Sequence, residues 1–552
     1  MSAVNILFIM YDQLRHDYLG FAGHPHLETP NMDWLASRGV RFSRCYAQST
    51  ICGASRMSFY TGRYVHSHGA SFNNFPLKVG EMTLGDHLRK AGMQAWLVGK
   101  THMSADAEGM ARLGIAPDSV IGARVGECGF DVWLRDDGLW AEGPDGFYDQ
   151  RRSPYIEYLK AKGYPGDNPW HDHANSGIGD SGEVASGWLM KNASMPANIR
   201  NEDSETPWLT SRAIDFLRER EGDPTPWLCH LSYIKPHWPY IVPAPYNTMY
   251  DRRHVLAAKR DPRERENPHP VYGAYMQNGI AKAFSRDEVR ETVIPAYMGL
   301  IRQCDDELGR LLRHLRDSGQ MNDTMIVLTS DHGDYLGDHW LGEKDLFHDP
   351  SVRIPLIVVD PRRSADATRG TVCDELVESI DLAATFIEVS GQAVPDHIVE
   401  GRSLIPFIEG RQPASWRTYA VSEFDYSPTG QAARLGLAPR DARLFMIADK
   451  RWKFMHAEGG MRPMLFDLEN DPDEFDDLGA SAAHGAIIAT MHERLAAWAR
   501  RPSQRTTMSE YAIRASRGKS LRKGVLLGLW DGSEVDVGLM SRIQGATTRR
   551  DA

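Results

Sequence analysis

Five short apolar segments, spaced along the first 360 residues, carry apolar side chains at nearly every position rather than at every second one. Such continuous runs, rich in β-branched and aromatic residues, are typical of strands that are buried on both faces. The segments are VNILFIM (4–10), QAWLVG (94–99), PWLCHLSYI (226–234), TMIVLTS (324–330) and PLIVVD (355–360). We therefore expect five buried parallel strands of one α/β sheet.

Between these segments the apolar residues recur with helical spacing, so that each stretch has one apolar face. The stretches are PNMDWLASRGV (30–40), TLGDHLRKAG (83–92), SRAIDFLRERE (211–221) and MGLIRQCDDELGRLLRHLRDSG (298–319). Strands that alternate with such helices predict a large mixed, mostly parallel sheet flanked by helices. The apolar faces are assigned to the core and carry no chemistry.

The pattern changes further along the chain. Residues 104–206 and 245–290 lack periodicity and are expected to be long loop insertions that shape a binding site or a subunit contact. From residue 415, short strands precede one helix, which predicts a small antiparallel sheet with a covering helix over 415–510. We therefore expect an α/β domain at 1–414, this smaller α+β domain, and an arm at 511–552 whose apolar residues favour docking on another subunit.

Composition narrows the class of protein. With 552 residues, 42% of them hydrophobic, the chain is long enough to form these two domains. A formal net charge of −11 argues against a general nucleic-acid binder, so no nucleic-acid partner is expected. The start, MSAVNILFIMYDQ, resembles no signal peptide, and no apolar run approaches the ~20 residues of a membrane span. Because the six cysteines lie without paired spacing, we expect a cytoplasmic protein with reduced thiols and no membrane partner.

Polar residues follow the carboxyl ends of four of the predicted strands. These residues are Asp12 and Gln13, Lys100 and His102, Lys235 and His237, and Asp331 and His332. In an open α/β sheet, ligands bind beyond the carboxyl ends of the strands, so the four groups are expected to converge on one crevice.

Four of these residues are suited to a divalent cation. Asp12, Gln13, Asp331 and His332 supply carboxylate, amide and imidazole ligands for Ca²⁺, Mn²⁺ or Mg²⁺. Taken separately, each pair also fits a helix cap or a chance tripeptide. Taken together, with lysine and histidine residues beside them, the two pairs favour one metal ion.

A cysteine and an arginine begin a predicted helix in STICGASRMSFYTGRY, residues 49–64. Thr50 is expected to cap this helix and Gly62 to end it, which places Cys52 in the first turn and Arg56 one turn later. Free backbone N–H groups and the guanidinium there would favour a tetrahedral oxyanion. The alternative is a small buried cysteine with a surface arginine. Beside a hard metal ion a thiolate is a poor ligand, but oxidation of the cysteine to an aldehyde would give a hydrated gem-diol, at once an oxygen ligand and a nucleophile.

The motif CGASR (52–56) resembles the C-x-P/A-x-R signature of type I sulfatases, in which the cysteine becomes formylglycine. Further segments resemble sulfatases in the order of the family, among them NILFIMYDQLRHDYLG, GKTH, PHWP and LTSDHGDYLGDHWLGEKD. Within the alkaline phosphatase superfamily, the chain resembles the branch of bacterial arylsulfatases and phosphonate monoester hydrolases. This resemblance rests on the pairs at 12–13 and 331–332 and on NNFPL after the signature helix. The resemblance implies an alkaline phosphatase-like catalytic domain at 1–414.

The resemblance also implies the roles of the site residues. One divalent cation, Ca²⁺ or Mn²⁺ with Mg²⁺ as the alternative, would be bound by Asp12, Gln13, Asp331, His332 and the modified Cys52. One formylglycine oxygen would attack sulfur or phosphorus in line, while Arg56, Lys100 and Lys344 stabilise the charge on the equatorial oxygens.

Three further residues would complete the site. His237 would protonate the leaving alcohol or bind a substrate oxygen, and His102 would accept the proton that is lost when sulfate is expelled. Asn73 would contact the substrate. Lys344, His237 and Asn73 also fit ordinary alternatives, namely a surface lysine, a strand-end cap and a turn residue.

Two positions depart from the family's common pattern. Ala54 stands where the commonest maturation signal has proline, so conversion of Cys52 would be partial or would need a particular formylglycine-generating maturation enzyme. Gln13 replaces a second carboxylate of many sulfatases and leaves the metal site less negative.

The charge of the pocket favours one of two substrate classes, sulfate monoesters or phosphonate monoesters. Lys100 and His102 match the residues that sulfatases carry at these positions, whereas phosphonate hydrolases of the family carry uncharged hydroxyl residues there. We therefore predict hydrolysis of small anionic sulfate monoesters, aryl sulfates among them, with cross-activity on phosphonate monoesters and phosphate diesters. The alternatives are a phosphonate monoester hydrolase or phosphodiesterase with the same nucleophile and a non-catalytic anion-binding protein. A two-zinc phosphatase is disfavoured, since a second set of ligands is not evident in the sequence.

Two expectations concern the periphery of the site. Aromatic residues in the long loops would line an aryl pocket or pack locally, namely Trp140, Phe147, Trp170, Trp188 and Trp238. By analogy with the branch, the arm at 511–552 predicts a homo-oligomer, either a dimer or a tetramer.

Overall fold

The structure is a computed structural model that describes residues 4–138, 153–517, 530–534, 536 and 538. The chain forms two compact units, Met1–Val394 with Val399–Arg501, and Pro395–Ile398 with Pro502–Ala552. Both large sheets lie in the first unit, and residue 414, the expected end of the first domain, falls between them. Trp140 and Phe147 lie outside the described residues.

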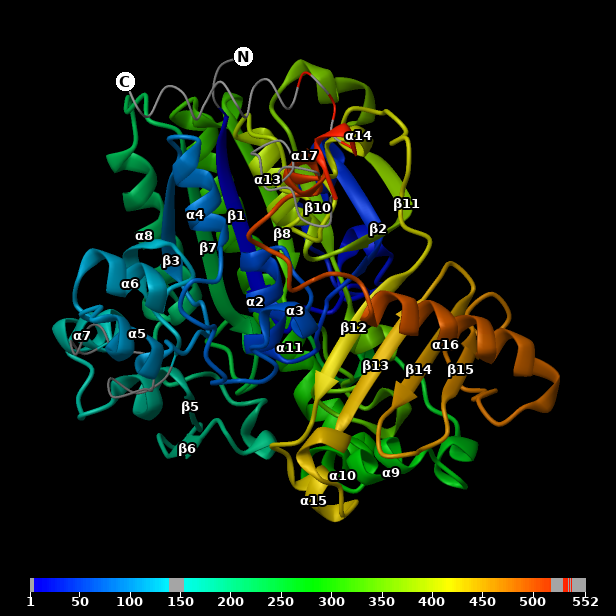
Figure 1. Cartoon of the computed structure of the whole chain (residues 1–552). Helices are drawn as coiled ribbons and strands as arrows, with labels where there is room; N and C mark the ends of the chain where they lie inside the picture. The colour runs from blue at the N-terminus through cyan, green and yellow to red at the C-terminus, as the bar shows by residue number, and fades with distance from the viewer. Residues whose placement is uncertain (1–3, 139–152, 518–529, 535, 537, 539–552) are drawn as a thin grey trace. The chain divides into compact units, whose positions relative to one another are not determined.

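A nine-stranded sheet forms the centre of the first unit (Figure 1). Its strands lie in the order β11-β2-β10-β8-β1-β7-β3-β4, and β9 pairs with β2. Their bounds are β1 Asn5–Asp12, β2 Val40–Tyr46, β3 Gln94–Gly99, β4 Asp131–Arg135, β7 Trp227–Pro236, β8 Thr324–Ser330, β9 Arg353–Ile354, β10 Leu356–Val359 and β11 Thr371–Glu378. β1 is parallel to β7 and β8, and β3 is parallel to β4 and β7. The predicted mixed, mostly parallel sheet is confirmed.

β10 runs in the opposite direction to the one predicted. It pairs antiparallel with both β8 and β2, so the prediction of a parallel strand at 355–360 is wrong. The chain leaves β8 at Ser330, and the segment that follows contains a 3₁₀ turn and the four-residue helix α12 (Asp349–Val352). A parallel strand needs a crossover that returns the chain to the other end of the sheet. This segment instead stays at the carboxyl end of β8, where Lys344 contacts Cys52, so β10 starts at the end where β8 stops.

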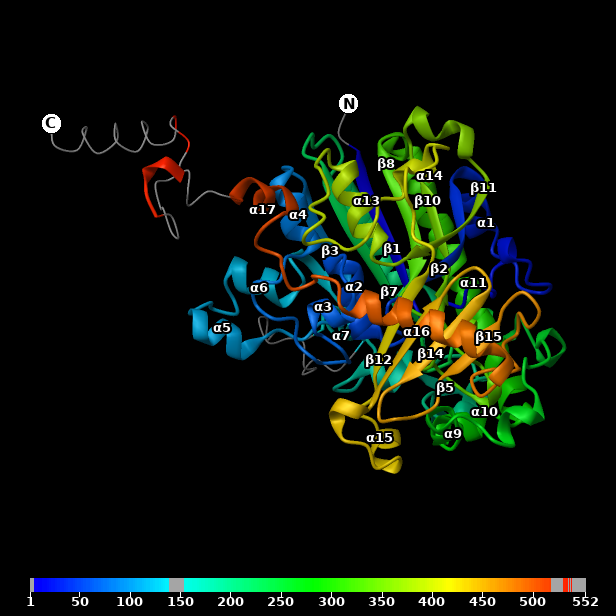
Figure 2. The same ribbon diagram turned by 45° about the vertical axis from the view of Figure 1, so that its right-hand side comes forward.

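Helices cover both faces of this sheet (Figures 1 and 2). Alternate residues of β1 point to opposite faces, so Ile9 and Phe8 belong to different cores. The core around Ile9 includes α1 (Pro30–Arg38), α8 (Glu205–Glu219) and α11 (Asp287–Asp317). The core around Phe8 includes α2 (Cys52–Thr61), α4 (Leu84–Lys90), α13 (Asp381–Val389) and α14 (Ile405–Ile408). The sheet is therefore buried on both faces, and polar side chains collect at its ends.

The two long insertions contain short elements of their own. The first holds α5 (Ala107–Leu113), α6 (Val120–Gly126), α7 (Pro154–Ala161), and the two-stranded sheet of β5 (Ser176–Ile178) and β6 (Val184–Ser186). It also supplies β4 to the central sheet, so this part of the expected loop is a strand. The second holds α9 (Pro270–Met276) and α10 (Gly279–Phe284). α3 (Val65–His68) follows α2 directly.

A four-stranded antiparallel sheet follows, as predicted. It consists of β12 (Ala420–Asp425), β13 (Arg443–Ala448), β14 (Trp452–Ala457) and β15 (Met464–Asp467), with α15 (Gly430–Arg434) in the connection between β12 and β13. α16 (Gly485–Ala499) covers one face, where Leu495 and Trp498 join the core of Phe445 and Phe454. The other face shares a core with α9 and the loop around Phe347.

A buried ion cluster joins the small sheet to the loop that precedes α12. Lys453 on β14 is fully buried, and its Nζ lies 2.6 Å from Asp349 Oδ1 and 2.7 Å from Glu474 Oε1. The same ammonium donates a hydrogen bond of 3.2 Å to the carbonyl of Phe347. Burial disfavours the charge on Lys453, but the two carboxylates raise its pKa above the ordinary value. These contacts therefore fix the loop after Lys344 to the small sheet.

The second unit contains α17 (Glu510–Ser516), in the arm expected at 511–552. Tyr511 and Trp530 in this unit are 82% and 91% exposed. None of the helices in the described part of the chain combines the length and the apolar character that a bilayer crossing requires.

Candidate active site

The helix predicted to start near Cys52 does so. α2 runs from Cys52 to Thr61 with every residue buried, and Gly62 ends it with a φ of 65°. The predicted cap is wrong, because Ile51 occupies the N-cap position and the Thr50 hydroxyl donates a hydrogen bond of 2.7 Å to the carbonyl of Asp345. Thr50 thus ties the start of α2 to the loop that carries Lys344.

The ends of β1 and β8 place four fully buried residues beside Cys52, namely Asp12, Gln13, Asp331 and His332. Ligand atoms of Asp12, Cys52, Asp331 and His332 lie within 4.8 Å of one another. His332 Nε2 is 3.1 Å from Cys52 Sγ and 3.6 Å from Asp12 Oδ1. Two neighbouring strand ends and one helix start therefore form a single polar centre.

His332 presents a lone pair to this centre. Its Nδ1 lies 2.9 Å from the carbonyl oxygen of Gly333, which can only accept a hydrogen bond, so in the neutral ring the proton is on Nδ1 and Nε2 is free to bind a cation. Burial disfavours the charged ring, but Asp331 and the Cys52 thiolate raise the pKa of His332 to about 9. The centre thus attracts positive charge, which a metal ion would supply in place of this proton.

Gln13 provides a further oxygen. Its Nε2 donates to the hydroxyl of Tyr240 at 3.1 Å and to Asp334 Oδ2 at 2.5 Å. Its Oε1 is buried and has no hydrogen-bond partner among the described residues. Because a buried carbonyl oxygen is costly to leave unpaired, and because carboxylate and amide oxygens suit hard dications, these residues fit one divalent cation.

Arg56 lies behind the two carboxylates. Its guanidinium is fully buried and donates from Nε to Asp331 Oδ2 at 2.8 Å and from Nη2 to Asp12 Oδ2 at 3.1 Å. Nη1 donates to Ser232 Oγ at 2.7 Å and to the carbonyl of Lys100 at 3.0 Å. These contacts favour a role in holding the carboxylates, rather than the direct contact with substrate oxygens that the resemblance implies.

Lys344 is in direct contact with the Cys52 sulfur. Its Nζ lies 3.0 Å from Cys52 Sγ and 3.2 Å from His237 Nε2. Burial would raise the pKa of the Cys52 thiol, but Lys344 and His332 lower it well below its usual value. An anion at this position is therefore stabilised by the surrounding side chains.

His237 faces Lys344 as an acceptor. Its Nδ1 lies 2.8 Å from the carbonyl oxygen of Trp238, so Nδ1 carries the proton and Nε2 is the free nitrogen. Burial lowers the pKa of His237 and favours the neutral ring, whereas the nearby carboxylate of Asp12 opposes this shift. Lys344 therefore carries the proton in this pair.

The remaining predicted residues surround the same point. Lys100 Nζ lies 2.7 Å from Asp12 Oδ2, and the side chain of His102 bonds to the Cys52 sulfur and helps to lower its pKa. Asn73 Oδ1 accepts a hydrogen bond of 2.8 Å from the backbone N–H of Gly53, the residue after Cys52. The structure thus brings every predicted site residue to the start of α2.

Sequence reasoning missed three residues that contact the site. Ser232 receives a hydrogen bond from Arg56, and Asp334 and Tyr240 both contact Gln13. Asp334 directly extends the DHG motif and was open to detection, whereas Ser232 lies within an apolar strand and gives no signal.

A second group of ligand types lies elsewhere. Glu264, His339 and His348 also bring ligand atoms within 4.8 Å of one another. The two imidazole rings stack with centroids 3.7 Å apart and an angle of 3° between their planes, and His339 Nδ1 lies 2.7 Å from Glu264 Oε1. Nitrogen lone pairs lie in the ring plane, so two stacked parallel rings do not direct them at one ion. We interpret the group as a hydrogen-bonded histidine–glutamate pair with a second ring stacked on the histidine.

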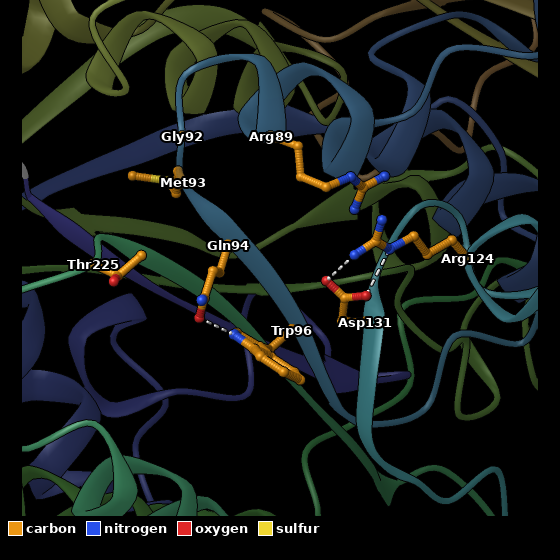
Figure 3. Close-up of a pocket in the computed structure, with 8 residues that line it drawn as sticks. All are labelled: Arg89, Gly92, Met93, Gln94, Trp96, Arg124, Asp131 and Thr225. Carbon is orange, nitrogen blue, oxygen red and sulfur yellow. Dashed lines mark hydrogen bonds and ion pairs between the residues drawn. The ribbon is translucent and has the colours of Figure 1, made fainter. Parts of the chain in front are cut away.

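A hollow of about 520 Å³ lies near the amino ends of β3, β4 and β7, at the other end of the strands from Cys52. Figure 3 shows its polar side chains turned toward one another, Arg124 to Asp131 and Gln94 to Trp96. Because these groups are already paired, the hollow lacks the converging free groups of a reaction site. The centre at Cys52 is the candidate active site.

Comparisons with known proteins agree with this fold and site. The family model described as Sulfatase matches residues 4–392, and one described as N-sulphoglucosamine sulphohydrolase, C-terminal, matches residues 337–501. The multifunctional alkaline phosphatase superfamily protein PehA of Trinickia caryophylli is 30% identical over 92% of this chain and 97% of its own. An arylsulfatase of Clostridium perfringens is 28% identical over 86% of this chain and 90% of its own.

A solved structure shows the same similarity. The phosphonate monoester hydrolase SpPMH from Silicibacter pomeroyi superposes with a TM-score of 0.79 at 30% identity, over 91% of this chain and 96% of that one. The chain therefore belongs to the sulfatase family. The resemblance seen in the sequence and the expectation of a sulfuric ester hydrolase are confirmed.

Proposed function

We propose that this protein hydrolyses sulfate monoesters, aryl sulfates among them, through a formylglycine formed from Cys52 and one divalent cation. The observation that carries the proposal is the position of Cys52, whose Sγ lies 3.1 Å from His332 Nε2 and 3.0 Å from Lys344 Nζ. Conversion of this side chain would supply a hydrated aldehyde as the nucleophile, next to both the metal ligands and a cation.

The metal would be held by oxygen and imidazole ligands. The residues that would hold it are Asp12, Gln13, Asp331, His332 and the converted Cys52. When bound, the cation would lower the pKa of the attacking hydroxyl and polarise an oxygen of the ester. A mainly oxygen-based set favours Ca²⁺ or Mn²⁺, with Mg²⁺ as the alternative.

The charged residues around Cys52 would act on the ester. Lys344 and Lys100 would stabilise negative charge on the sulfuryl oxygens. His237, next to Lys344, would bind the leaving oxygen or pass a proton to it, and His102 would accept the proton that is released when sulfate leaves. Asn73, beside the start of α2, would contact the substrate.

A phosphonate monoester hydrolase is the second candidate, favoured by the similarity to SpPMH. Sulfate esters are preferred because the similar arylsulfatase and the sulfatase family model both point to them, and because Lys100 and His102 add basic groups that interact with Cys52. We infer cross-activity on phosphonate monoesters and phosphate diesters, whose charge and size are close to those of a sulfate monoester.

The partners and the organisation of the chain belong to the same proposal. Because Cys52 is only 1% exposed, a formylglycine-generating enzyme would meet it before the chain folds. Exposed Tyr511 and Trp530 support an arm that contacts another copy in a dimer or tetramer, after domains at 1–414 and 415–510. We propose a cytoplasmic location and a small anionic ester as the substrate.

Peptide mass spectrometry across Cys52 tests the proposal directly. We expect a loss of about 18 Da from the cysteine, in a fraction that scales with turnover of 4-nitrophenyl sulfate. An unmodified cysteine in fully active protein would contradict the proposed nucleophile. The ratio of kcat/KM for an aryl sulfate to that for an aryl phosphonate monoester, measured on the same sample, decides between the two substrate classes.

An aromatic series leads outward from His237. The rings of His237 and Trp238 have centroids 4.7 Å apart, those of Trp238 and Trp188 5.1 Å, and those of Trp188 and buried Trp170 6.0 Å. Trp188 is 37% exposed, so its ring can accept a further aromatic group. We propose that the aryl part of the ester lies here.

Trp188→Ala is therefore expected to raise KM for 4-nitrophenyl sulfate about 3- to 10-fold, the worth of one aromatic contact. KM for a short alkyl sulfate should change less than about 2-fold, because that ester has no ring to place. Steady-state kinetics with both esters measures the difference, and Trp34→Ala, at a tryptophan of α1 with 40% exposure, is the control. Equal changes for the two esters would contradict the assignment.

A further inference from the structure

We propose that Asp334 and Tyr240 are positioning residues that fix the side-chain amide of Gln13 so that its oxygen is presented to the metal. The inference rests on the metal site of the proposed function. It assigns a purpose to three buried residues, of which two were not expected to take part in the site.

The contacts around the amide form a closed triangle. Gln13 Nε2 donates to Asp334 Oδ2 at 2.5 Å and to the Tyr240 hydroxyl at 3.1 Å, and this hydroxyl donates to the same Asp334 oxygen at 2.6 Å. The other oxygen, Asp334 Oδ1, accepts from the backbone N–H of Leu336 at 2.9 Å. All three side chains of the triangle are buried. The triangle is therefore both shielded from water and fixed to the backbone.

The backbone of Gln13 is held as well. Its φ is 65°, its N–H donates to Asp331 Oδ1 at 3.1 Å, and its carbonyl accepts from the Tyr297 hydroxyl at 2.7 Å. A glutamine in the left-handed region is uncommon and persists only where its surroundings determine it. The amide thus has a fixed origin, and its end group is set by the triangle.

The donor and acceptor pattern permits one orientation of this end group. A carboxylate only accepts hydrogen bonds, and the Tyr240 proton is already given to Asp334, so both neighbours of the amide accept from it. They therefore select the NH₂ end of Gln13 and leave Oε1, which has no partner among the described residues, for a cation. A flipped amide would set its oxygen against the carboxylate and turn N–H groups toward the metal.

This selection matters because residue 13 is a glutamine. A carboxylate offers an oxygen in either orientation, whereas an amide offers an oxygen in one orientation and a repulsive N–H dipole in the other. Hydrogen-bonding partners behind a ligand orient it and tune its affinity. Asp334 and Tyr240 would thus supply the directionality that the neutral ligand lacks.

Binding of Mn²⁺ and of Ca²⁺ to the chelator-treated full chain, measured by calorimetry, tests this inference. Asp334→Asn is expected to weaken binding about 10- to 100-fold, since the new amide can donate and so permits the flipped Gln13. Tyr240→Phe should cost less, about 2- to 5-fold, because the carboxylate still selects the NH₂ end. Asp317→Asn, at an exposed aspartate, is the matched control and should bind like the wild type.

An exchange of the two groups separates orientation from general stability. In the double variant Gln13→Glu with Asp334→Asn, the amide at 334 donates and the carboxylate at 13 accepts, with the total charge unchanged. We expect binding to return to within about 3-fold of the wild type, whereas Gln13→Glu alone places two carboxylates in contact and should lower the melting temperature. If Asp334 acted only by stabilising the fold, these variants would change the melting temperature and leave the affinity of the folded protein for both ions unchanged.

The outcomes distinguish the inference from the function beneath it. Wild-type protein that binds neither ion would overturn the proposed metal site itself. Wild-type binding together with unchanged affinity in Asp334→Asn, or no recovery in the double variant, would overturn only the positioning role. If Asp334→Asn alone does not fold, Tyr240→Phe and the double variant decide by the same criteria.

Discussion

Cys52→Ala is expected to lower kcat/KM for 4-nitrophenyl sulfate by about 10⁴-fold or more, because the variant has no side chain from which a nucleophile can form. The fold should persist, since α2 is buried over its whole length and alanine suits a helix. Steady-state kinetics gives the loss, and thermal unfolding shows that it does not come from the fold.

Two further variants make this result specific. Cys52→Ser has a hydroxyl in place of the thiol. Its kcat/KM should fall as far as that of Cys52→Ala, because the proposed mechanism requires conversion of the cysteine and not only a nucleophilic side chain. Cys373→Ala, at a partly buried cysteine on β11, should keep wild-type activity. Activity within about 10-fold of the wild type in Cys52→Ala would return Cys52 to a structural role.

Arg56→Ala has the second large expected effect, and it acts on stability and activity together. The substitution leaves Asp12 and Asp331 as neighbouring buried carboxylates without the guanidinium that bonds to both. Removal of one partner from a buried ion pair costs about 3–5 kcal/mol, so the free energy of unfolding should fall by this amount. Because the same carboxylates are the proposed metal ligands, kcat/KM should fall by about 10³-fold even under conditions where the variant is folded.

Arg56→Lys separates charge from geometry. A single ammonium keeps the positive charge but cannot bond to Asp12, Asp331 and Ser232 in the planar arrangement of a guanidinium. We expect an intermediate loss of stability in urea unfolding and a loss of metal affinity. Arg440→Lys, at an exposed arginine, is the control, and equal stability of the two lysine variants would contradict the buried network.

The strands that the sequence predicts well are those buried on both faces. β1, β3, β7 and β8 begin and end within two residues of the predicted segments, because continuous apolar runs mark them clearly. β2, β4 and β11 were not predicted, because they contain shorter apolar runs and are only partly buried. The direction of β10 is set by the loop before it, which no local pattern in that strand records.

The sequence predicts those parts of the site that follow from one rule of sheet topology. Parallel strands bring their carboxyl ends together, so Asp12 and His332 were expected to meet although 320 positions separate them. The partners of Thr50 and Arg56 were not predictable, because a side chain of either type has many common local roles. Their contacts depend on packing between distant segments and become visible only in three dimensions.

The buried contact of Lys453 with Asp349 and Glu474 also limits how such a protein can evolve. The small sheet fixes the loop that carries Lys344, so an exchange of the C-terminal part between relatives, cut near residue 414, would separate Lys453 from a partner that lies before the cut. Such chimaeras would inherit an intact nucleophile and a displaced lysine. The two sheets are therefore expected to be inherited as one unit, and diversity of substrates to arise in the long insertions instead.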